Sequence, residues 1–204
     1  MTSAAPPSLA DAVGGPLGIA ESVLPTVAFV ATYTLSGQDT EAALIAAIAL
    51  GVVFTIARIA RGKTVQFALA GLGGLALSAY VVSRTGNASD FFLPGLLANA
   101  GYATAYLVSI LVRWPLLGII VAALQGKGME WRKDPGAIRR YSLASWIWVG
   151  LFSLRLAVQL PLYLADSLTA LGVARIAMGV PLFAVGIWLS WLILRPRVAP
   201  PAPA

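Results

Sequence analysis

The sequence predicts an all-α fold, a bundle of membrane-spanning helices, and three observations carry this prediction. Hydrophobic residues make up 59% of the 204 residues and charged residues only 11%, whereas soluble domains carry about 25% charged residues. Mean hydropathy is +0.85. The apolar residues are also gathered in long runs, and a helix needs about 20 of them in succession to cross the hydrocarbon core of a bilayer. The chain length fits one domain, so we expect a single polytopic membrane domain.

Six apolar runs are long enough to be spans. They cover residues 18–35, 41–58, 64–82, 91–112, 141–165 and 168–194. Residues 1–17 carry no Lys or Arg ahead of their apolar part and therefore lack the charged start of a signal peptide, so we expect a flexible N-terminal tail. Residues 195–204 form a Pro/Ala tail, which leaves 18–194 as the predicted transmembrane domain.

The apolar segment 113–126 is about half a membrane thickness long if helical. It is either a seventh span or an interfacial or re-entrant helix that follows a break at Pro115. With six spans, nearly all loop Lys and Arg residues lie on the same side as both termini, and only Arg84 lies on the other side. A seventh span would move the basic loop 126–140 across the membrane and remove this asymmetry. The positive-inside rule therefore predicts a cytoplasmic-leaflet helix at 113–126 and cytoplasmic N and C termini.

Six spans also divide into two sets of three with opposite orientation. The stretch "ESVLPTVAFVATY" opens the first set and "DFFLPGLLANAGYATAY" opens the second, and each has Leu-Pro near its start and a Tyr further along. Inverted repeats of this kind are common in transporters. Chance recurrence of Leu-Pro in a Leu-rich chain is the alternative, so a three-plus-three inverted repeat is a hypothesis.

Small residues recur at helical spacing in two predicted spans, which puts them on one helix face and lets a second backbone approach closely. They are Ala43, Ala47, Gly51 and Thr55 in the second span, and Ala70, Gly71, Gly74 and Ser78 in the third. We expect these faces to pack within a compact bundle. The same faces offer a surface for a homo-oligomer.

A largely polar stripe follows the fourth span and another follows the fifth. In the fourth span the residues are Gly95, Asn99, Tyr102, Tyr106, Ser109 and Arg113. In the fifth they are Ser145, Trp148, Phe152, Arg155, Gln159 and Tyr163. Polar groups inside a bilayer need partners, so both stripes should face the protein interior or a wet cavity. The topology brings parts of both stripes to a similar depth in the outer half of the bundle. The polar cluster predicted there consists of Asn99, Tyr102, Arg155, Gln159 and, from the sixth span, Arg175.

Arg155 most needs an explanation, because an arginine at the bilayer centre costs about 2.5–3.5 kcal/mol even on a lenient scale and stays protonated. One interpretation is structural: the guanidinium donates to helix-end carbonyls, to Tyr hydroxyls or to an outer acid such as Asp166, while Arg175 extends outwards to water. The other is that Arg155 and Arg175 bind an anionic group in an outward-opening cavity. The other three residues of the cluster would then complete the hydrogen bonds of the ligand.

The acidic residues allow simpler explanations. Glu21, four residues before Pro25, lies near the cytoplasmic end of the first span. It is either a proton- or cation-coupling group or a helix-start acid favoured by the helix macrodipole. The acids at the outer ends of the spans are expected on a solvated surface. These are Asp39, Glu41, Asp90 and Asp166.

Two residue types are missing from the sequence, which contains no Cys and no His. Disulfides, thiolate chemistry and Cys-ligated metals are thereby excluded, and so are the commonest general base and the usual ligand of catalytic metals. We therefore expect no enzymatic activity, no cofactor and no metal site. The net charge of +6 does not indicate nucleic acid, since the basic residues lie between long apolar runs. The expected partners are membrane lipids, with anionic headgroups at the basic cytoplasmic loop, and a small anionic ligand.

Three stretches give the chain a resemblance to a known family. They are "VLPTVAFVATYTLSGQDTEAALIAAIALGVVFTIAR", "GLGGLAL" and "WRKDPGAIRRYSLASWIWVGLF". Together they resemble an actinobacterial family of small Ala/Leu-rich integral membrane proteins of unknown function, over nearly the whole chain except the tails. The "LP…Y…D…A" opening and the basic turn that follows also resemble the intracellular septation protein A group, which is implicated in envelope and division processes. These resemblances imply a multi-pass protein of the bacterial cytoplasmic membrane.

Two functions fit these observations. The possible repeat and the buried polar residues favour a transporter or channel-like protein that binds an anionic solute or lipid headgroup. The septation resemblance and the lack of a large soluble domain favour an envelope or cell-division scaffold with no transport activity. A continuous polar cavity that reaches Arg155 would support the first, and a dry bundle would support the second.

Overall fold

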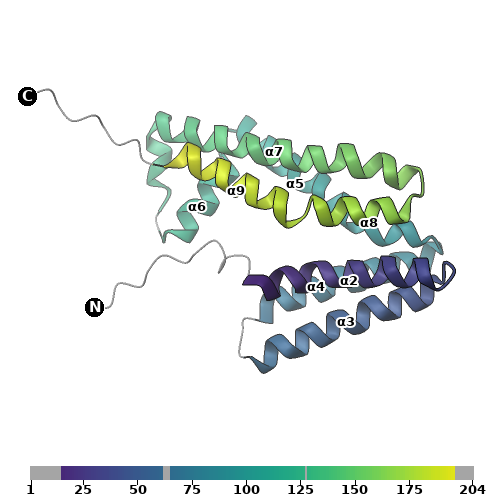
Figure 1. Cartoon of the computed structure of the whole chain (residues 1–204). Coiled ribbons are helices and arrows are strands. Elements are labelled where there is room, and N and C mark those ends of the chain that lie inside the picture. Colours follow the sequence, from purple (N-terminus) through teal and green to yellow (C-terminus); the bar gives the residue numbers. More distant parts are fainter. Residues whose placement is uncertain (1–14, 62–64, 127, 196–204) are drawn as a thin grey trace, which may run out of the picture. The chain divides into compact units, whose positions relative to one another are not determined.

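The computed structural model describes residues 15–61, 65–126 and 128–195. The elements in chain order are α2 (Gly15–Leu35), α3 (Thr40–Ala60), α4 (Val65–Thr85), η1 (Ala88–Phe92), α5 (Leu93–Leu111), α6 (Leu116–Leu124), η2 (Met129–Lys133), α7 (Pro135–Leu164), α8 (Leu168–Ala177) and α9 (Val180–Leu194) (Figure 1). The described part of the chain contains no strand, so the predicted all-α class is confirmed. Each predicted span is helical along most of its length, and α6 is the short helix expected within 113–126. Nearly all of both predicted tails lies outside the described residues.

Within the described ranges, four helical segments are long and apolar enough to cross a membrane. They are Thr40–Ala60, Ala88–Leu111, Pro135–Leu164 and Leu168–Leu194. The second joins η1 to α5, and the fourth joins α8 to α9. Their length and composition are those of an integral membrane protein.

Helix α7 begins six residues before the predicted start of the fifth span at position 141. Pro135 is its first residue, a position where the missing N–H and the fixed φ of proline suit a helix. Asp134 lies just ahead, and its Oδ1 accepts a hydrogen bond of 2.8 Å from the backbone N–H of Gly136. This cap satisfies one of the free N–H groups at the helix start and explains the earlier beginning.

The sixth predicted span is interrupted. Helix α8 ends at Ala177 and α9 begins at Val180. Pro181 is the cause, because it has no N–H and its ring excludes the carbonyl of Ala177, four residues earlier, from a regular helix. Gly179 lies between the two helices with φ −77° and ψ −111°. The backbone thus leaves the helical conformation within an otherwise apolar segment.

The chain divides into two compact units. Unit 1 comprises residues 1–95 and 159–177, and so contains α2, α3, α4, η1, the start of α5, the end of α7 and α8. Unit 2 comprises residues 96–158 and 178–204, and contains α6, η2, α9 and the greater part of α5 and α7.

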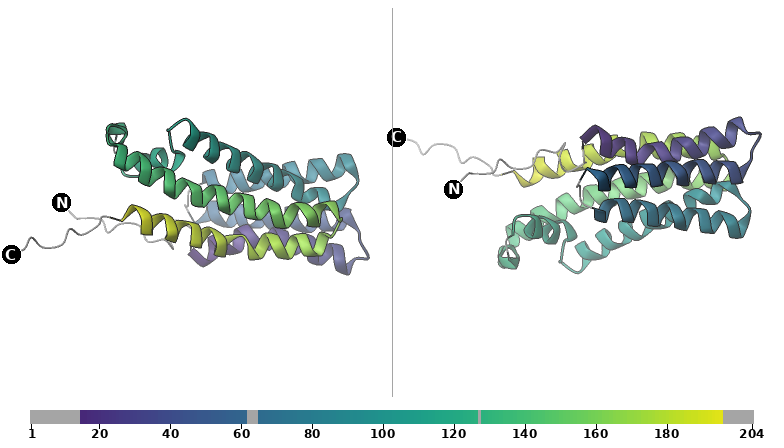
Figure 2. Two further views of the ribbon diagram at one scale, coloured as in Figure 1. Left: turned by 90° about the horizontal axis from the view of Figure 1, so that it is seen from above. Right: turned by 90° about the horizontal axis from the view of Figure 1, so that it is seen from below.

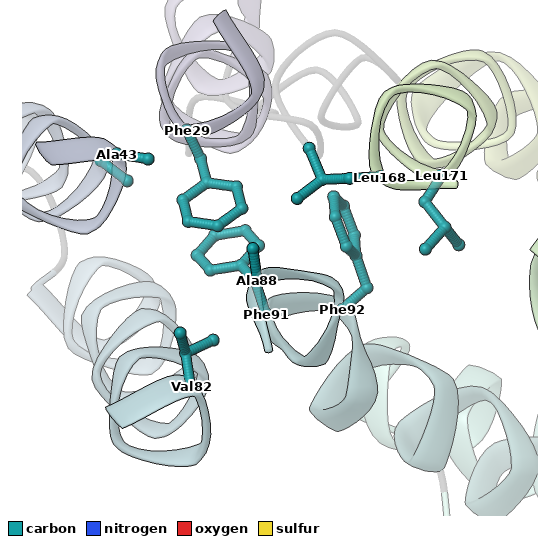
Figure 3. Close-up of a cluster of buried hydrophobic side chains, with 9 residues drawn as sticks. Phe29, Ala43, Val82, Ala88, Phe91, Phe92, Leu168 and Leu171 are labelled. Carbon is teal, nitrogen blue, oxygen red and sulfur yellow. The ribbon is translucent and has the colours of Figure 1, made fainter. Parts of the chain in front are cut away.

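In unit 1, α2, α3 and α4 lie side by side (Figures 1 and 2). The turn from α2 to α3 uses Gly37 and Gln38, whose φ angles are 73° and 72°. Asp39 then caps α3, since its side chain accepts from the N–H of Ala42 at 3.0 Å. The core lies where η1 meets the helices: Phe91 stacks on Phe29 of α2 with ring centroids 4.0 Å apart, and Phe92 extends towards α8 (Figure 3).

The predicted small-residue face of α3 is confirmed. Its buried residues are Ala43, Ala47, Gly51 and Thr55. A Cβ added at Gly51 would lie 2.8 Å from Cδ2 of Leu75, so α4 approaches this face closely. The corresponding expectation for α4 is wrong at Gly71 and Gly74, which are exposed and have no atom within 4 Å of an added Cβ. The α4 side chains nearest to Gly51 are instead those of Leu72 and Leu75. The side chain of Ala70 lies outside the described residues.

Unit 2 has a separate core built on aromatic residues. Tyr106 of α5 stacks on Trp148 of α7 with ring centroids 5.9 Å apart. Trp148 Nε1 donates to Ser190 Oγ of α9 at 3.0 Å, and the Ser190 hydroxyl donates to the carbonyl of Gly186 at 2.8 Å. A Cβ at Gly186 would lie 2.8 Å from Cδ1 of Leu151. Gly186 therefore allows α7 and α9 to approach closely enough for this hydrogen bond.

Candidate functional site

Helix α7 carries two buried hydrogen-bond donors that lack an acceptor. Arg155 is half-buried and Gln159, one turn further on, is only 3% exposed. Arg155 Nε and Gln159 Nε2 are both inaccessible to solvent and have no hydrogen-bond partner among the described residues. Leaving a buried donor unsatisfied costs about 1–3 kcal/mol, and more when the group is charged. The arrangement therefore leaves both donors open to an acceptor outside the described residues, such as an anion or water.

The face of α7 that holds these donors is buried as predicted. Ser145, Trp148 and Phe152 of the same stripe are all buried. The structural interpretation of Arg155 required an internal acceptor such as Asp166. Among residues 15–61, 65–126 and 128–195, Arg155 makes no such hydrogen bond or ion pair, and Asp166 is exposed.

The stripe on α5 is buried at Asn99, Tyr106 and Ser109. Tyr102 is 54% exposed, so it does not lie in the protein interior, and its part in a polar cavity stays a prediction. Ala103 packs into the core in its place, and Tyr102 lies about 100° further round the helix. The ring of Tyr102 still contacts Phe152, with centroids 5.2 Å apart.

Arg175 of α8 lies in unit 1 against the aromatic pair of η1. Its Cζ is 5.6 Å from the ring centroid of Phe92 and 6.0 Å from that of Phe91. A Cβ added at Gly95 would lie 3.5 Å from Arg175 Nη1, so this glycine provides the room that the guanidinium occupies. The aromatic rings offer a half-buried cation an attraction of about 0.5–2 kcal/mol.

The predicted cluster of five residues falls in both units. Asn99, Tyr102 and Arg155 belong to unit 2, whereas Gln159 and Arg175 belong to unit 1. Arg155 and Gln159 are neighbours on successive turns of α7, and Asn99 and Tyr102 are neighbours on successive turns of α5. Ligand binding by the whole cluster stays a prediction.

Glu21 is paired with Arg58, the last residue of the second predicted span. Arg58 Nε donates to Glu21 Oε2 at 2.8 Å, and Arg58 Nη2 approaches the same oxygen. The two side chains are 14% and 17% exposed. Glu21 begins the first predicted span and Arg58 ends the second, so antiparallel neighbours bring them together. This ion pair gives Glu21 a structural role, and a role in coupling stays a prediction.

A second polar pair lies in unit 1. The hydroxyl of Tyr163 donates to Asp90 Oδ1 at 2.5 Å. Asp90 is only 7% exposed, so the expectation of a solvated outer surface is wrong for this acid. The sequence contained a signal for this pair. Asp90 precedes the fourth predicted span and Tyr163 lies at the end of the fifth, so the predicted topology puts both on the same side of the membrane. Within the described residues no three Asp or Glu side chains gather into a metal-binding group.

Comparison with known families places the chain in an uncharacterised group. The model described as "Protein of unknown function (DUF3159)" matches residues 13–201. No curated protein and no solved structure matches the chain. The predicted resemblance to a family of unknown function is confirmed by this match, whereas the resemblance to septation protein A stays a prediction.

Proposed function

Because the chain belongs to the DUF3159 family of unknown function, we propose its role from its own geometry: a six-span transporter of a small anionic solute in the bacterial cytoplasmic membrane. The observation that carries this proposal is the pair of buried donors without acceptors on α7, Arg155 Nε and Gln159 Nε2. They form an anion-binding element within a segment that is long and apolar enough to span a membrane.

The six-span topology is supported by helix length and by charge. Besides the four long apolar segments, α2 and α4 each have 21 residues, or about 30 Å of helix, which matches the hydrocarbon thickness. With six spans, the basic residues around α6 and η2 share one side with both termini. The positive-inside rule assigns that side to the cytoplasm.

The chemistry of the two donors favours an oxyanion. The planar guanidinium of Arg155 fits carboxylate and phosphate oxygens through parallel N–H groups. Gln159 adds an amide donor one turn away, and Asn99 is a further buried amide in the same unit as Arg155. A cation would be repelled by Arg155, and no Asp or Glu among the described residues forms an ion pair with this arginine that would neutralise its charge.

The interruption between α8 and α9 also favours transport over a purely structural role. Non-helical backbone within a membrane is tolerated where it is buried in protein or lines a water-filled cavity. Discontinuous helices of this kind are typical of transporters, where they form substrate and ion sites. Met178 and Gly179 are half-buried at this break.

An envelope scaffold without transport activity is the second candidate. The open face of α4 favours it, because Gly71 and Gly74 are exposed and leave room for a helix of another chain. A scaffold of this kind would need no anion at Arg155.

A thermal-shift screen of the purified chain against inorganic phosphate, acetate and succinate tests the proposal. A ligand at 100 times its dissociation constant stabilises by about 2.7 kcal/mol. We expect one of these anions to stabilise the wild type but not Arg155→Lys. Lysine keeps the positive charge but lacks the parallel N–H groups of the guanidinium. Arg84→Lys is the matched control, since Arg84 is exposed. An anion that stabilises both variants equally would argue against a site at Arg155.

A further inference from the structure

A second set of buried donors lies at the end of unit 2 where α5 finishes and α7 begins. The connection between these helices runs through α6 and η2 (Figure 1). Arg132 of η2 stacks its guanidinium on Trp114, with Cζ 3.5 Å from the ring centroid. This cation–π contact holds the guanidinium plane against the start of the α5–α6 connection and limits its orientation.

Two adjacent side chains of η2 each present an N–H without an acceptor. Arg132 Nε and Trp131 Nε1 are inaccessible to solvent and have no hydrogen-bond partner within the described ranges. Buried N–H groups are normally paired, so two unpaired donors on consecutive residues indicate an acceptor outside the described residues.

Trp131 is held firmly in place by its neighbours. A Cβ added at Gly118 of α6 would lie 2.8 Å from Trp131 Cη2, so the indole ring packs directly on the α6 backbone. The ring also packs edge-on against Tyr141 of α7, with centroids 5.0 Å apart. The indole N–H is therefore pre-oriented, as a binding group needs to be.

The surroundings are basic and partly apolar. Residues 113–140 contain six Lys or Arg and two Asp or Glu. Large apolar side chains are exposed beside them: Leu124 of α6 is 82% exposed, and Ile120, Met129 and Trp114 are exposed as well. Exposed tryptophan, aliphatic and basic side chains together are typical of a surface at the membrane–water interface. A soluble anion would require the charge but not the exposed apolar side chains.

We propose that Trp131 and Arg132 form a headgroup site for an anionic phospholipid. The phosphate accepts hydrogen bonds from Arg132, which Trp114 holds in place, and the indole N–H of Trp131 donates to the headgroup. The exposed apolar residues of α6 lie against the acyl chains. This site is distinct from Arg155 and does not depend on the proposed transport.

Native mass spectrometry of the detergent-purified full chain with added phosphatidylglycerol tests the proposal. Arg132→Lys and Arg132→Gln should each retain about tenfold less lipid than the wild type, the loss expected for a charge-assisted hydrogen bond. Lys133→Gln is the matched control, because Lys133 is the exposed neighbour of Arg132 and its replacement removes the same charge. It should reduce retention less than Arg132→Gln does, since an exposed Lys near anionic lipid contributes only about 1 kcal/mol, or about fivefold. Trp131→Phe keeps an aromatic ring but removes the N–H, and it should weaken retention while the chain stays folded.

Three results would overturn the proposal. Equal losses in Arg132→Gln and Lys133→Gln would indicate diffuse charge attraction rather than a site. If Arg132→Lys and Trp131→Phe each retained as much phosphatidylglycerol as the wild type, neither donor would bind the headgroup. If inorganic phosphate stabilised the lipid-free protein against unfolding and phosphatidylglycerol was not retained, the two donors would bind a soluble anion instead.

Discussion

Replacing Gly172 of α8 with alanine tests the closest helix approach in unit 1. A Cβ at this position would lie 2.5 Å from Cγ2 of Val30 in α2, whereas carbon atoms in contact prefer about 3.5–4.0 Å. Val30 is β-branched and stiff at χ1, so its methyl group cannot easily turn away. The helices must therefore separate by roughly 1 Å, and such overpacking costs about 1–3 kcal/mol.

The magnitude requires a correction for helix propensity. Any Gly→Ala change inside a helix gains about 0.8–1 kcal/mol from the lower entropy of the unfolded chain, which masks part of the clash. Gly74→Ala in α4 supplies the matched control, since nothing lies within 4 Å of its added Cβ. The free energy of unfolding of Gly172→Ala should therefore be about 1–3 kcal/mol below that of Gly74→Ala.

Titration with sodium dodecyl sulfate in mixed micelles, followed by tryptophan fluorescence, measures both variants. Combining Gly172→Ala with Val30→Ala removes the clashing methyl group, so the two changes should show a favourable coupling of about 0.5–3 kcal/mol. Equal stability of Gly172→Ala and Gly74→Ala would refute the close packing of α8 on α2.

Three further outcomes follow from the described contacts. Ser190→Ala leaves the indole N–H of Trp148 without its acceptor and should lower the free energy of unfolding by about 0.6 kcal/mol and at most about 1.7 kcal/mol, the mean and maximum for hydrogen bonds between membrane helices; an unchanged value would mean that the bond contributes nothing. A double-mutant cycle with Glu21→Gln and Arg58→Gln should give a coupling of about 0.5–3 kcal/mol by thermal unfolding, and additive effects would contradict the ion pair. In a chain without native cysteine, Gly128→Cys should react with a membrane-impermeant maleimide only after the cells are opened, and labelling of intact cells would contradict the proposed topology.

The sequence predicted features that repeat along a single helix. The spacing of Ala43, Ala47, Gly51 and Thr55 places them on one face whatever the neighbouring helix is, and all four are buried. The same reasoning was wrong for Gly71 and Gly74, because small residues show only that a backbone can be approached closely. They do not show that the approaching helix belongs to the same chain.

Pairs between distant positions were harder to predict. Glu21 with Arg58 and Asp90 with Tyr163 each join residues that lie far apart in sequence. The predicted topology put the two members of each pair at the same membrane surface. Which polar side chains meet there depends on which helices are neighbours, and the sequence does not show this. The break before α9 could have been predicted from Pro181, whose effect on the preceding turn is local.

The position of the candidate site was predictable from the sequence, but the hydrogen-bond partners of its residues were not. An arginine on an apolar helix indicates a functional residue from the sequence alone. Its lack of an acceptor in the part of the chain that the structure describes emerges only from the structure, because the sequence allows any Tyr, Asp or backbone carbonyl on a neighbouring helix as a partner. The Trp131 and Arg132 donors were not singled out, since their burial depends on Gly118 of α6 and on Trp114 in the connection between α5 and α6.

Uptake into proteoliposomes tests the proposed transport most directly. The anion that stabilises the wild type in the thermal-shift screen is supplied in radiolabelled form outside vesicles containing wild type, Arg155→Lys or Arg84→Lys. We predict uptake above protein-free vesicles for the wild type and for Arg84→Lys, and its loss in folded Arg155→Lys. Equal uptake by Arg155→Lys, or no uptake by a wild type that binds the anion, would contradict transport through a site at Arg155.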